Sequence, residues 1–137
     1  MDNRVVEGFA AQGMMGHIGA VLEAADDGMC RIRAPIVAEV SQQAGFAHAG
    51  LAFSIGDSAA GFAALTLMPQ DRDVVTVEMK INLTAPAKGA FLLATGRVIQ
   101  PGRRLFVVQA EVMALDARDT VLGPVAIMQG TMAARRV

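Results

Sequence analysis

The run from Gly50 to Met68 is the feature that most limits what this chain can fold into. It holds almost only apolar or small residues and is rich in glycine, alanine and serine. Each glycine inside a helix costs about 1 kcal/mol relative to alanine, so a helix of this composition needs a compensating gain. Small side chains allow other backbone to approach closely, which supplies such a gain. The run therefore predicts a buried helix that other elements wrap tightly.

Asp57 and Ser58 interrupt this run at its middle. The run approaches the length of a membrane span, but the central carboxylate and the absence of a second apolar run favour a buried helix. An ionised carboxylate taken out of water without a partner is costly, so it shifts its pKa, finds donors or is replaced. Asp57 is therefore a candidate for chemistry. The alternative is a structural role, in which Asp57 binds the backbone N–H groups of a crossing loop.

The segments outside this run have strand and helix patterns. In Val74–Leu83 the apolar residues at odd positions alternate with polar residues, which is the period of a strand with one buried face. Three further segments have strand character, and their short links favour antiparallel neighbours. These segments are Phe91–Ile99, Leu105–Leu115 and Thr120–Met132. Before the apolar run, the patterns predict a helix over Asn3–Gln12 and a hairpin of His17–Ala24 and Met29–Ala34.

The order of these elements predicts one α+β domain over residues 1–137. An antiparallel sheet of about six strands would wrap around one long central helix. Such a sheet has two open edges, and pairing of an edge with a second copy of the chain would protect it. We therefore expect a homodimer that pairs into a dimer of dimers.

Charge and cysteine content limit the classes of partner. The chain has 12 Lys and Arg against 13 Asp and Glu, so no strong field attracts nucleic acid or an anionic membrane surface. A small molecule is the expected partner. The single cysteine, Cys30, excludes an internal disulfide and offers no cysteine cluster for a metal, which suits a reducing compartment. The first residues are too charged for a signal peptide, so we expect a cytoplasmic protein.

Several motifs along the chain carry a family resemblance. From about residue 10 to about residue 133, their order resembles that of the hotdog-fold acyl-CoA thioesterases, and the branch looks like the phenylacetate-pathway (PaaI-like) type. The motifs are Gln42-x-x-Gly45-x-x-His48-Ala49-Gly50, the helical Asp57, Val75–Met79, Pro86–Gly89 and Gly102–Arg104. The resemblance implies hydrolysis of a small, medium-chain or aromatic acyl-CoA at a site between two subunits.

The resemblance also implies roles for individual residues. Asp57 would be the acid that drives hydrolysis, either as a base toward water or as a nucleophile. A backbone N–H of the turn His48-Ala49-Gly50 would stabilise the oxyanion, because N–H groups that open a helix point outward. Ala49 stands where the family has glycine, but alanine keeps the N–H group. The site would be completed by the amide side chain of Gln42 and the hydroxyl of Thr76.

The remaining candidates concern the coenzyme A part of the substrate. Lys88, Arg103 and Arg104 are expected either to bind its phosphates or to be solvated turn residues. No metal and no separate cofactor is implied. A non-catalytic acyl-CoA-binding module on the same fold is the alternative to an enzyme. A hydro-lyase is disfavoured, since hydratases of this fold carry a histidine five residues after the aspartate and this chain has Phe62 there.

Overall fold

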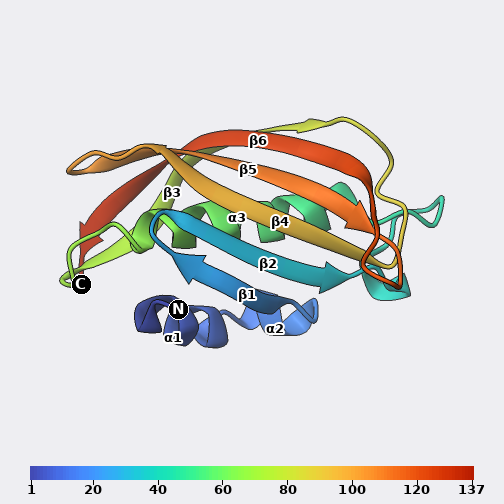
Figure 1. The fold of residues 1–137 in the computed structure, drawn as a ribbon, viewed down its shortest axis with the longest axis horizontal. Coiled ribbons are helices and arrows are strands. Elements are labelled where there is room, and N and C mark those ends of the chain that lie inside the picture. Colours follow the sequence, from blue (N-terminus) through green and yellow to red (C-terminus); the bar gives the residue numbers. More distant parts are fainter.

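The computed structural model describes residues 1–137 and shows a six-stranded antiparallel sheet curled around one long helix (Figure 1). The strand order across the sheet is β1-β2-β4-β5-β6-β3, so β1 and β3 form its edges. This confirms the predicted hotdog architecture. The short link between β3 and β4 had predicted that these two strands are neighbours, which is wrong, because β3 crosses to the far edge and pairs with β6. The strands are β1 Val21–Asp26, β2 Met29–Pro35, β3 Arg72–Leu83, β4 Phe91–Gln100, β5 Leu105–Leu115 and β6 Val121–Arg136. The helices are α1 Asn3–Ala11, α2 Gly13–His17 and α3 Ala49–Leu65, with a short 3₁₀ helix over Ala38–Val40.

Helix α3 lies in the concave face of the sheet, as the small-residue run predicts. Eleven of its 17 residues are buried. A Cβ atom added to Gly96 of β4 would lie 2.4 Å from the backbone of Ala59, and one added to Gly56 would lie 2.2 Å from Met128 Sδ. At Gly96 the backbones of helix and sheet therefore touch directly, and at Gly56 the Met128 side chain packs against the helix backbone. No helix of the protein combines the length and the apolar character needed to cross a membrane.

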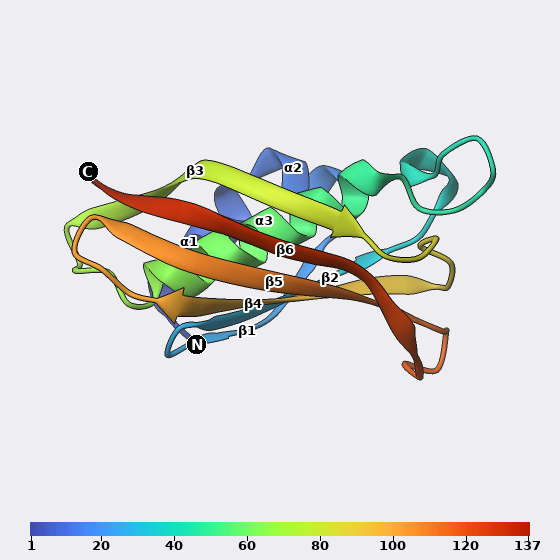
Figure 2. The same cartoon turned by 90° about the horizontal axis from the view of Figure 1, so that it is seen from above.

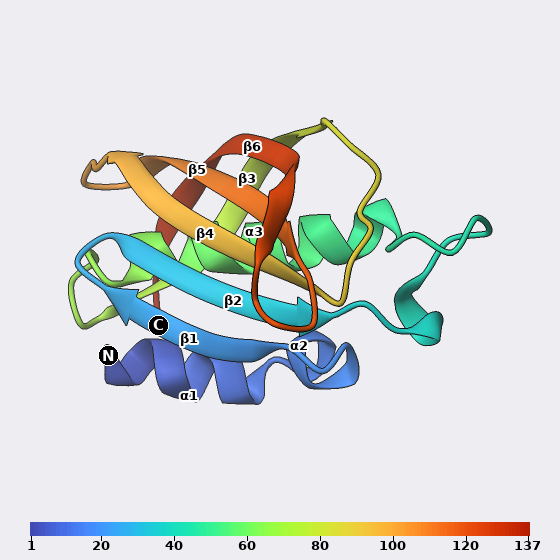
Figure 3. The same ribbon diagram turned by 45° about the vertical axis from the view of Figure 1, so that its right-hand side comes forward.

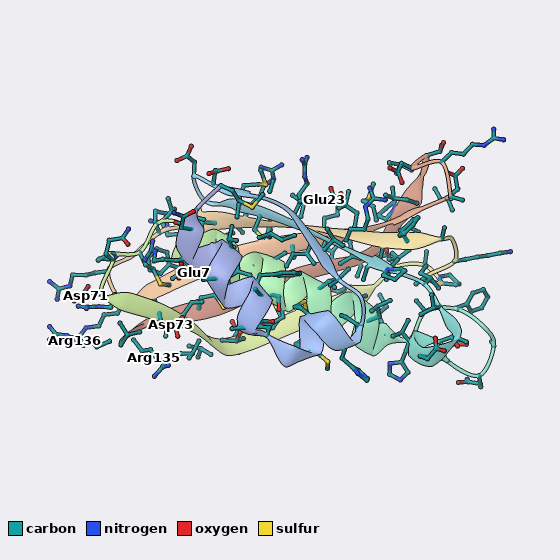
Figure 4. All side chains as sticks on the ribbon, turned by 90° about the horizontal axis from the view of Figure 1, so that it is seen from below. Glu7, Glu23, Asp71, Asp73, Arg135 and Arg136 are labelled. Atoms are coloured by element: carbon teal, nitrogen blue, oxygen red, sulfur yellow. The ribbon has the colours of Figure 1, made fainter.

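Helices α1 and α2 lie along the side of α3 that the sheet leaves open (Figures 3 and 4). Phe9 of α1 packs on Phe62 of α3, with 6.4 Å between the ring centroids. The Arg4 guanidinium donates hydrogen bonds to the carbonyl oxygens of Leu65 at 2.9 Å and Met68 at 3.1 Å. A cation at the C-terminal end of a helix satisfies unpaired carbonyls and complements the helix dipole. Arg4 thus fixes the start of the chain to the end of α3.

The prediction of a strand beginning at His17 was wrong. His17 is the last residue of α2, and β1 begins only at Val21. Met15 and Ile18 are both buried, and their spacing of three residues is that of a helical turn. Gly19 then takes a positive φ of 69°, which turns the chain into β1.

The predicted alternation of β3 was only partly right, because a β-bulge interrupts it. Thr76 pairs with Met132 and Glu78 pairs with Thr131, so Val77 is an extra residue without a partner. An extra residue reverses the side on which the following residues lie. Met79 and Ile81 pack against the core as predicted, whereas Val75 and Val77 are exposed. The bulge also turns Thr76 toward α3.

The connection between β2 and α3 projects beyond the end of the sheet (Figures 2 and 3). Within it, Ser41 and Ala47 form an isolated antiparallel bridge, and the Gln42 N–H donates to the Phe46 carbonyl at 2.9 Å. Gly45 has a φ of 87°, a conformation that favours glycine. The connection is thus a structured loop that ends at the first residue of α3.

Candidate active site

Asp57 lies on α3 about two turns after the helix begins, and Thr76 faces it from the edge strand β3. The Thr76 hydroxyl donates a hydrogen bond of 2.8 Å to Asp57 Oδ1, and no backbone N–H donates to this carboxylate. The carboxyl group is half-buried, and burial raises the pKa of Asp57, while the Thr76 hydrogen bond opposes this shift. The alternative, in which Asp57 accepts hydrogen bonds from the backbone N–H groups of a crossing loop, is therefore not supported by the contacts of Asp57.

A cavity of about 190 Å³, which we call the acid pocket, opens beside Asp57. Its walls come from α3, from β3 and β6, and from the junction of α1 and α2. The lining residues are Gln12, Asp57, Ser58, Gly61, Phe62, Val74, Thr76 and Met132. The lining is therefore mainly polar, with Phe62, Val74 and Met132 as its apolar part.

The turn that opens α3 is capped by its own histidine. His48 is the N-cap residue, and its Nδ1 atom accepts a hydrogen bond of 2.8 Å from the Gly50 N–H. A ring nitrogen that accepts is unprotonated, so in the neutral ring the proton lies on Nε2. The Ala49 N–H, in contrast, has no acceptor in the chain. An unpaired N–H at the positive end of a helix dipole is a donor for an anionic oxygen.

Gln42 and the His48-Ala49 turn line a larger cavity of about 650 Å³, which we call the turn cavity. The Gln42 Oε1 atom accepts a hydrogen bond from the Ala44 N–H, which leaves the Gln42 amide N–H groups as donors. Most of the other walls are apolar and include Leu83 and Val125 at the ends of β3 and β6. The turn cavity therefore combines amide donors with an apolar surface.

The two cavities lie at different levels of α3. Ala49 and Asp57 are eight residues apart, which corresponds to about 12 Å along a helix. A catalytic group and an oxyanion donor must both lie about 3 Å from the atoms they act on. One chain therefore brings Asp57 together with Thr76, and Gln42 together with His48 and Ala49, but it does not bring these two groups to one reacting carbon.

The predicted phosphate-binding residues are also separated. Lys88 is exposed in the β3–β4 connection and lines a cavity of about 450 Å³ that shares walls with the turn cavity. Arg103 and Arg104 are exposed in the β4–β5 connection, at the other end of the ten-residue strand β4 (Figure 2). A strand of that length spans roughly 33 Å. Lys88 and the two arginines of one chain therefore cannot bind the same phosphate.

Two polar residues that line the acid pocket were not identified as site residues from the sequence. The Ser58 hydroxyl donates a hydrogen bond of 3.1 Å to Gln12 Oε1, which ties the α1–α2 junction to α3. Ser58 could have been found, because it is the polar neighbour of Asp57 in an apolar run. Gln12 carries no such signal, since only the packing of α1 and α2 on α3 brings it to the pocket.

Comparison with known proteins places this geometry among thioesterases. Residues 44–121 match the family model described as the thioesterase superfamily. The chain is 33% identical over 104 residues to "Putative esterase SSO1253" of Saccharolobus solfataricus, covering 76% of this chain and 67% of that protein. A thioesterase family protein from Silicibacter pomeroyi has a structure similar to this one, with a TM-score of 0.94, 33% identity and 98% of both chains covered.

The PaaI protein of Escherichia coli, from the phenylacetic acid degradation operon, is also similar in structure. Its TM-score is 0.82 over 98% of this chain and 91% of that chain, with 19% sequence identity. At this identity the likeness shows a shared fold.

Proposed function

This chain belongs to the thioesterase superfamily, and from that premise we propose that it hydrolyses an acyl-CoA thioester to the free acid and coenzyme A. The observation that carries the proposal is the half-buried Asp57, whose only hydrogen-bond partner is the Thr76 hydroxyl. A carboxylate with a raised pKa that borders a pocket is suited to act as a base. Coenzyme A enters as part of the substrate, so no separate cofactor is needed.

The proposed chemistry divides between the two groups of residues. Asp57 removes a proton from a water that attacks the thioester carbon, or attacks that carbon itself to give an anhydride that water then cleaves. The carbonyl oxygen becomes an anion, to which the Ala49 N–H and the Gln42 amide donate. Collapse of this intermediate expels the coenzyme A thiolate. The thiolate takes the proton that Asp57 removed from water in the first route, and a proton from solvent water in the second. Thr76 holds the carboxylate of Asp57 in position through its hydrogen bond.

The separation of the two groups supports a homodimer in which Asp57 of one subunit meets Gln42 and Ala49 of the other. The edge strand β3 has no neighbour beyond it and exposes Val75 at 43% and Val77 at 57%. Pairing two copies through β3 would satisfy its backbone groups and cover these side chains. A two-fold axis makes the paired edge strands antiparallel, so opposite ends of the two sheets lie side by side.

This arrangement also gives the proposal for coenzyme A binding. Lys88 lies at one end of the sheet and Arg103 and Arg104 lie at the other, so the antiparallel pairing brings Lys88 of one subunit toward the arginines of the second. We include both sets as phosphate ligands contributed by different subunits. The proposal has three further parts. Two dimers pair into a dimer of dimers, the preferred acyl group is small, medium-chain or aromatic as in the PaaI-like type, and the protein is cytoplasmic.

The first experiment is a panel of acyl-CoA esters assayed by release of free thiol. We expect turnover of several short, medium-chain or aromatic esters, with Asp57→Ala inactive. Acyl-CoA binding without thiol release would favour the non-catalytic binding module instead.

A complementation experiment tests the shared site. Gln42→Ala and Asp57→Ala chains, each inactive alone, are unfolded together and refolded. Half of the dimers would then be mixed, and each mixed dimer keeps one intact site of two, so about a quarter of the wild-type activity should return. A protein that is monomeric by light scattering under assay conditions, with full turnover, would contradict the dimeric site.

A further inference from the structure

The carboxyl group of Asp57 has one oxygen atom engaged and one free. The Thr76 hydroxyl donates to Oδ1 at 2.8 Å, and no group of the chain donates a hydrogen bond to Oδ2. An ionised carboxylate accepts hydrogen bonds through both of its oxygen atoms. Oδ2 is therefore the atom that can take a proton from a water molecule, while the hydrogen bond from Thr76 holds the orientation of the group.

Gln12 directs two donors into the same cavity. The Ser58 hydroxyl donates to Gln12 Oε1 at 3.1 Å, whereas the Gln12 amide N–H groups have no acceptor in the chain. Gln12 and Asp57 both line the acid pocket, and Ser58 directly follows Asp57 in α3. The hydrogen bond from Ser58 therefore ties the Gln12 amide to the part of the helix that carries the carboxylate.

The backbone of Gln12 is fixed as well, at the junction of α1 and α2. Its N–H donates to the Phe9 carbonyl at 3.1 Å, and its carbonyl accepts from the Gly16 N–H at 3.3 Å. Helix α1 is in turn attached to α3 by the packing of Phe9 on Phe62 and by the hydrogen bonds of Arg4. A side chain that is held at both ends loses little freedom when it binds a reactant, which favours accurate positioning.

We infer that the Gln12 amide binds the water molecule that attacks the thioester, while this water donates a hydrogen bond to Asp57 Oδ2. The water then has one lone pair directed at Gln12, one proton directed at the base, and its second lone pair left for the thioester carbon. Gln12 is thus a further catalytic residue, and Ser58 is a positioning residue that acts through it. The inference rests on the proposed hydrolysis, in its route through water, and adds what holds that water.

The character of the acid pocket suits a water molecule. A bound water needs roughly two to four polar partners and occupies about 30 Å³ in the liquid. The acid pocket has a volume of about 190 Å³, and its polar walls are Gln12, Asp57, Ser58 and Thr76. The pocket is partly open to solvent, so a new water molecule can enter after each turnover.

The test is Gln12→Met, which keeps the unbranched shape of the side chain and removes both donors. We expect kcat to fall roughly five- to tenfold, the range for one neutral hydrogen bond. KM should change by no more than about twofold, because Gln12 contacts the attacking water and not the bound substrate. The loss should be equal for acetyl-CoA and phenylacetyl-CoA, since the same water attacks both.

Two further measurements separate this role from a structural one. The acid limb of the kcat profile against pH should stay in place in Gln12→Met, because a displaced Asp57 would change its burial or its Thr76 hydrogen bond and so shift its pKa. In an Asp57→Asn background, Gln12→Met should cost no more than about twofold, because a water without its base gains little from being positioned.

Ser58→Ala is the second variant, since it removes only the hydroxyl that orients Gln12. It should lower kcat by about threefold, less than Gln12→Met does, because both amide donors remain, and it carries the test if Gln12→Met fails to fold. The control is Gln109→Met, the same change on the outer face of the sheet, where the Gln109 amide donates to Gln129. This control should leave kcat and KM unchanged.

The outcomes separate this inference from the proposed function. If the wild-type protein releases thiol and Gln12→Met keeps kcat within about twofold, or loses activity on only one ester, Gln12 does not bind the attacking water and the hydrolysis stands. A shifted acid limb, or incorporation of ¹⁸O into Asp57 during turnover in labelled water, also overturns the inference. If no acyl-CoA releases thiol with the wild-type protein, the proposed function itself fails.

Discussion

The two faces of helix α3 use small residues for opposite purposes. On the face toward the sheet, Gly56 and Ala59 let Met128 and the backbone of β4 come into direct contact with the helix. On the open face, Asp57, Ser58 and Gly61 border a cavity. The first face is filled and the second is kept free.

Gly56 and Gly61 show this difference most directly. A Cβ atom at Gly56 would overlap Met128 Sδ at 2.2 Å, whereas a Cβ atom at Gly61 would find its nearest neighbours at 3.8 Å, an ordinary contact distance. Both glycines reduce helix propensity by the same amount. Gly56 is therefore explained by packing, and Gly61 by the space that it leaves in the acid pocket.

Gly96→Ala should have the largest effect on stability, because it adds a methyl group on the sheet where the sheet contacts the filled face of α3. The new Cβ atom would lie 2.4 Å from the backbone C and O atoms of Ala59, which cannot move as a side chain can. We expect a loss of about 3 kcal/mol or more in the free energy of unfolding, at the upper end for overpacking. Urea unfolding measures it. Gly16→Ala in α2, where nothing lies within 4 Å of the added atom, is the control and should not destabilise.

Asp57→Asn probes the open face and keeps the shape of the side chain. Loss of the carboxylate should lower kcat by roughly a hundredfold or more. The thermal midpoint at neutral pH should hold or rise, because no backbone donor loses a partner and an ionised group leaves a desolvated position. Asp71→Asn is the control, an exposed acid paired with Arg72. A lower midpoint with turnover intact would make Asp57 a structural residue and favour the binding module.

The pH dependence of this stability difference has a definite sign. The folded-state pKa of Asp57 is raised, so the folded protein binds this proton more tightly than the unfolded chain. The cost of ionising Asp57 is absent below the unfolded pKa, near 3.9, and complete above the folded pKa. The stability gain of Asp57→Asn should therefore be largest above the folded-state pKa and vanish as the pH falls toward about 4. Thermal midpoints of both proteins across this range measure it.

Charge reversal of Arg103 and Arg104 tests whether these two arginines in the β4–β5 connection bind the phosphates of coenzyme A. The double change to glutamate should raise KM for acyl-CoA by about tenfold and leave kcat nearly unchanged, because phosphate contacts are equal in the ground and transition states. Added salt should weaken wild-type binding in the same way. Arg118→Glu in the β5–β6 turn is the control. An unchanged KM would return Arg103 and Arg104 to solvated turn residues.

The sequence predicted the elements well wherever local pattern determines them. The small-residue run and the strands after it follow from composition and period, and the short links correctly predict that β4 pairs with β5 and β5 with β6. The equally short link between β3 and β4 does not join neighbours, because β3 pairs with β6 at the edge of the sheet. The bulge at Val77 could not be predicted, because the alternation of β3 continues through it without a break. That bulge decides which of Val75 and Thr76 faces α3, so the tertiary pairing of β3 with β6 determines an essential feature of the site.

The candidate site was predictable residue by residue but not as an assembly. Asp57 and Thr76 were both expected in the site, and the wrapping of β3 along α3 brings their side chains within 2.8 Å. Lys88 and Arg103 were grouped as one phosphate clamp, which the length of β4 rules out within one chain. Gln12 was missed because nothing in its local sequence distinguishes it from a surface glutamine.

Gly61→Ala should have the smallest effect on stability and the most selective effect on activity. The added methyl group fits between Met132 and Val74 without overlap, and alanine favours a helix, so the free energy of unfolding should rise by up to about 1 kcal/mol. The same methyl group occupies part of the acid pocket. We expect kcat/KM for phenylacetyl-CoA to fall several-fold while acetyl-CoA is hydrolysed as before, since one added carbon in a pocket changes selectivity by about tenfold.

The matched control is Gly56→Ala, the same change on the filled face of α3. Because its Cβ atom overlaps Met128 Sδ, this variant should lose about 1 to 3 kcal/mol of stability, and it should keep the ratio of the two esters. Urea unfolding and thiol release on both variants give the comparison. If Gly61→Ala destabilises the protein as Gly56→Ala does, α3 has no free face at this position. If Gly61→Ala gains stability and the ratio of kcat/KM for the two esters stays unchanged, the acyl group does not enter the acid pocket.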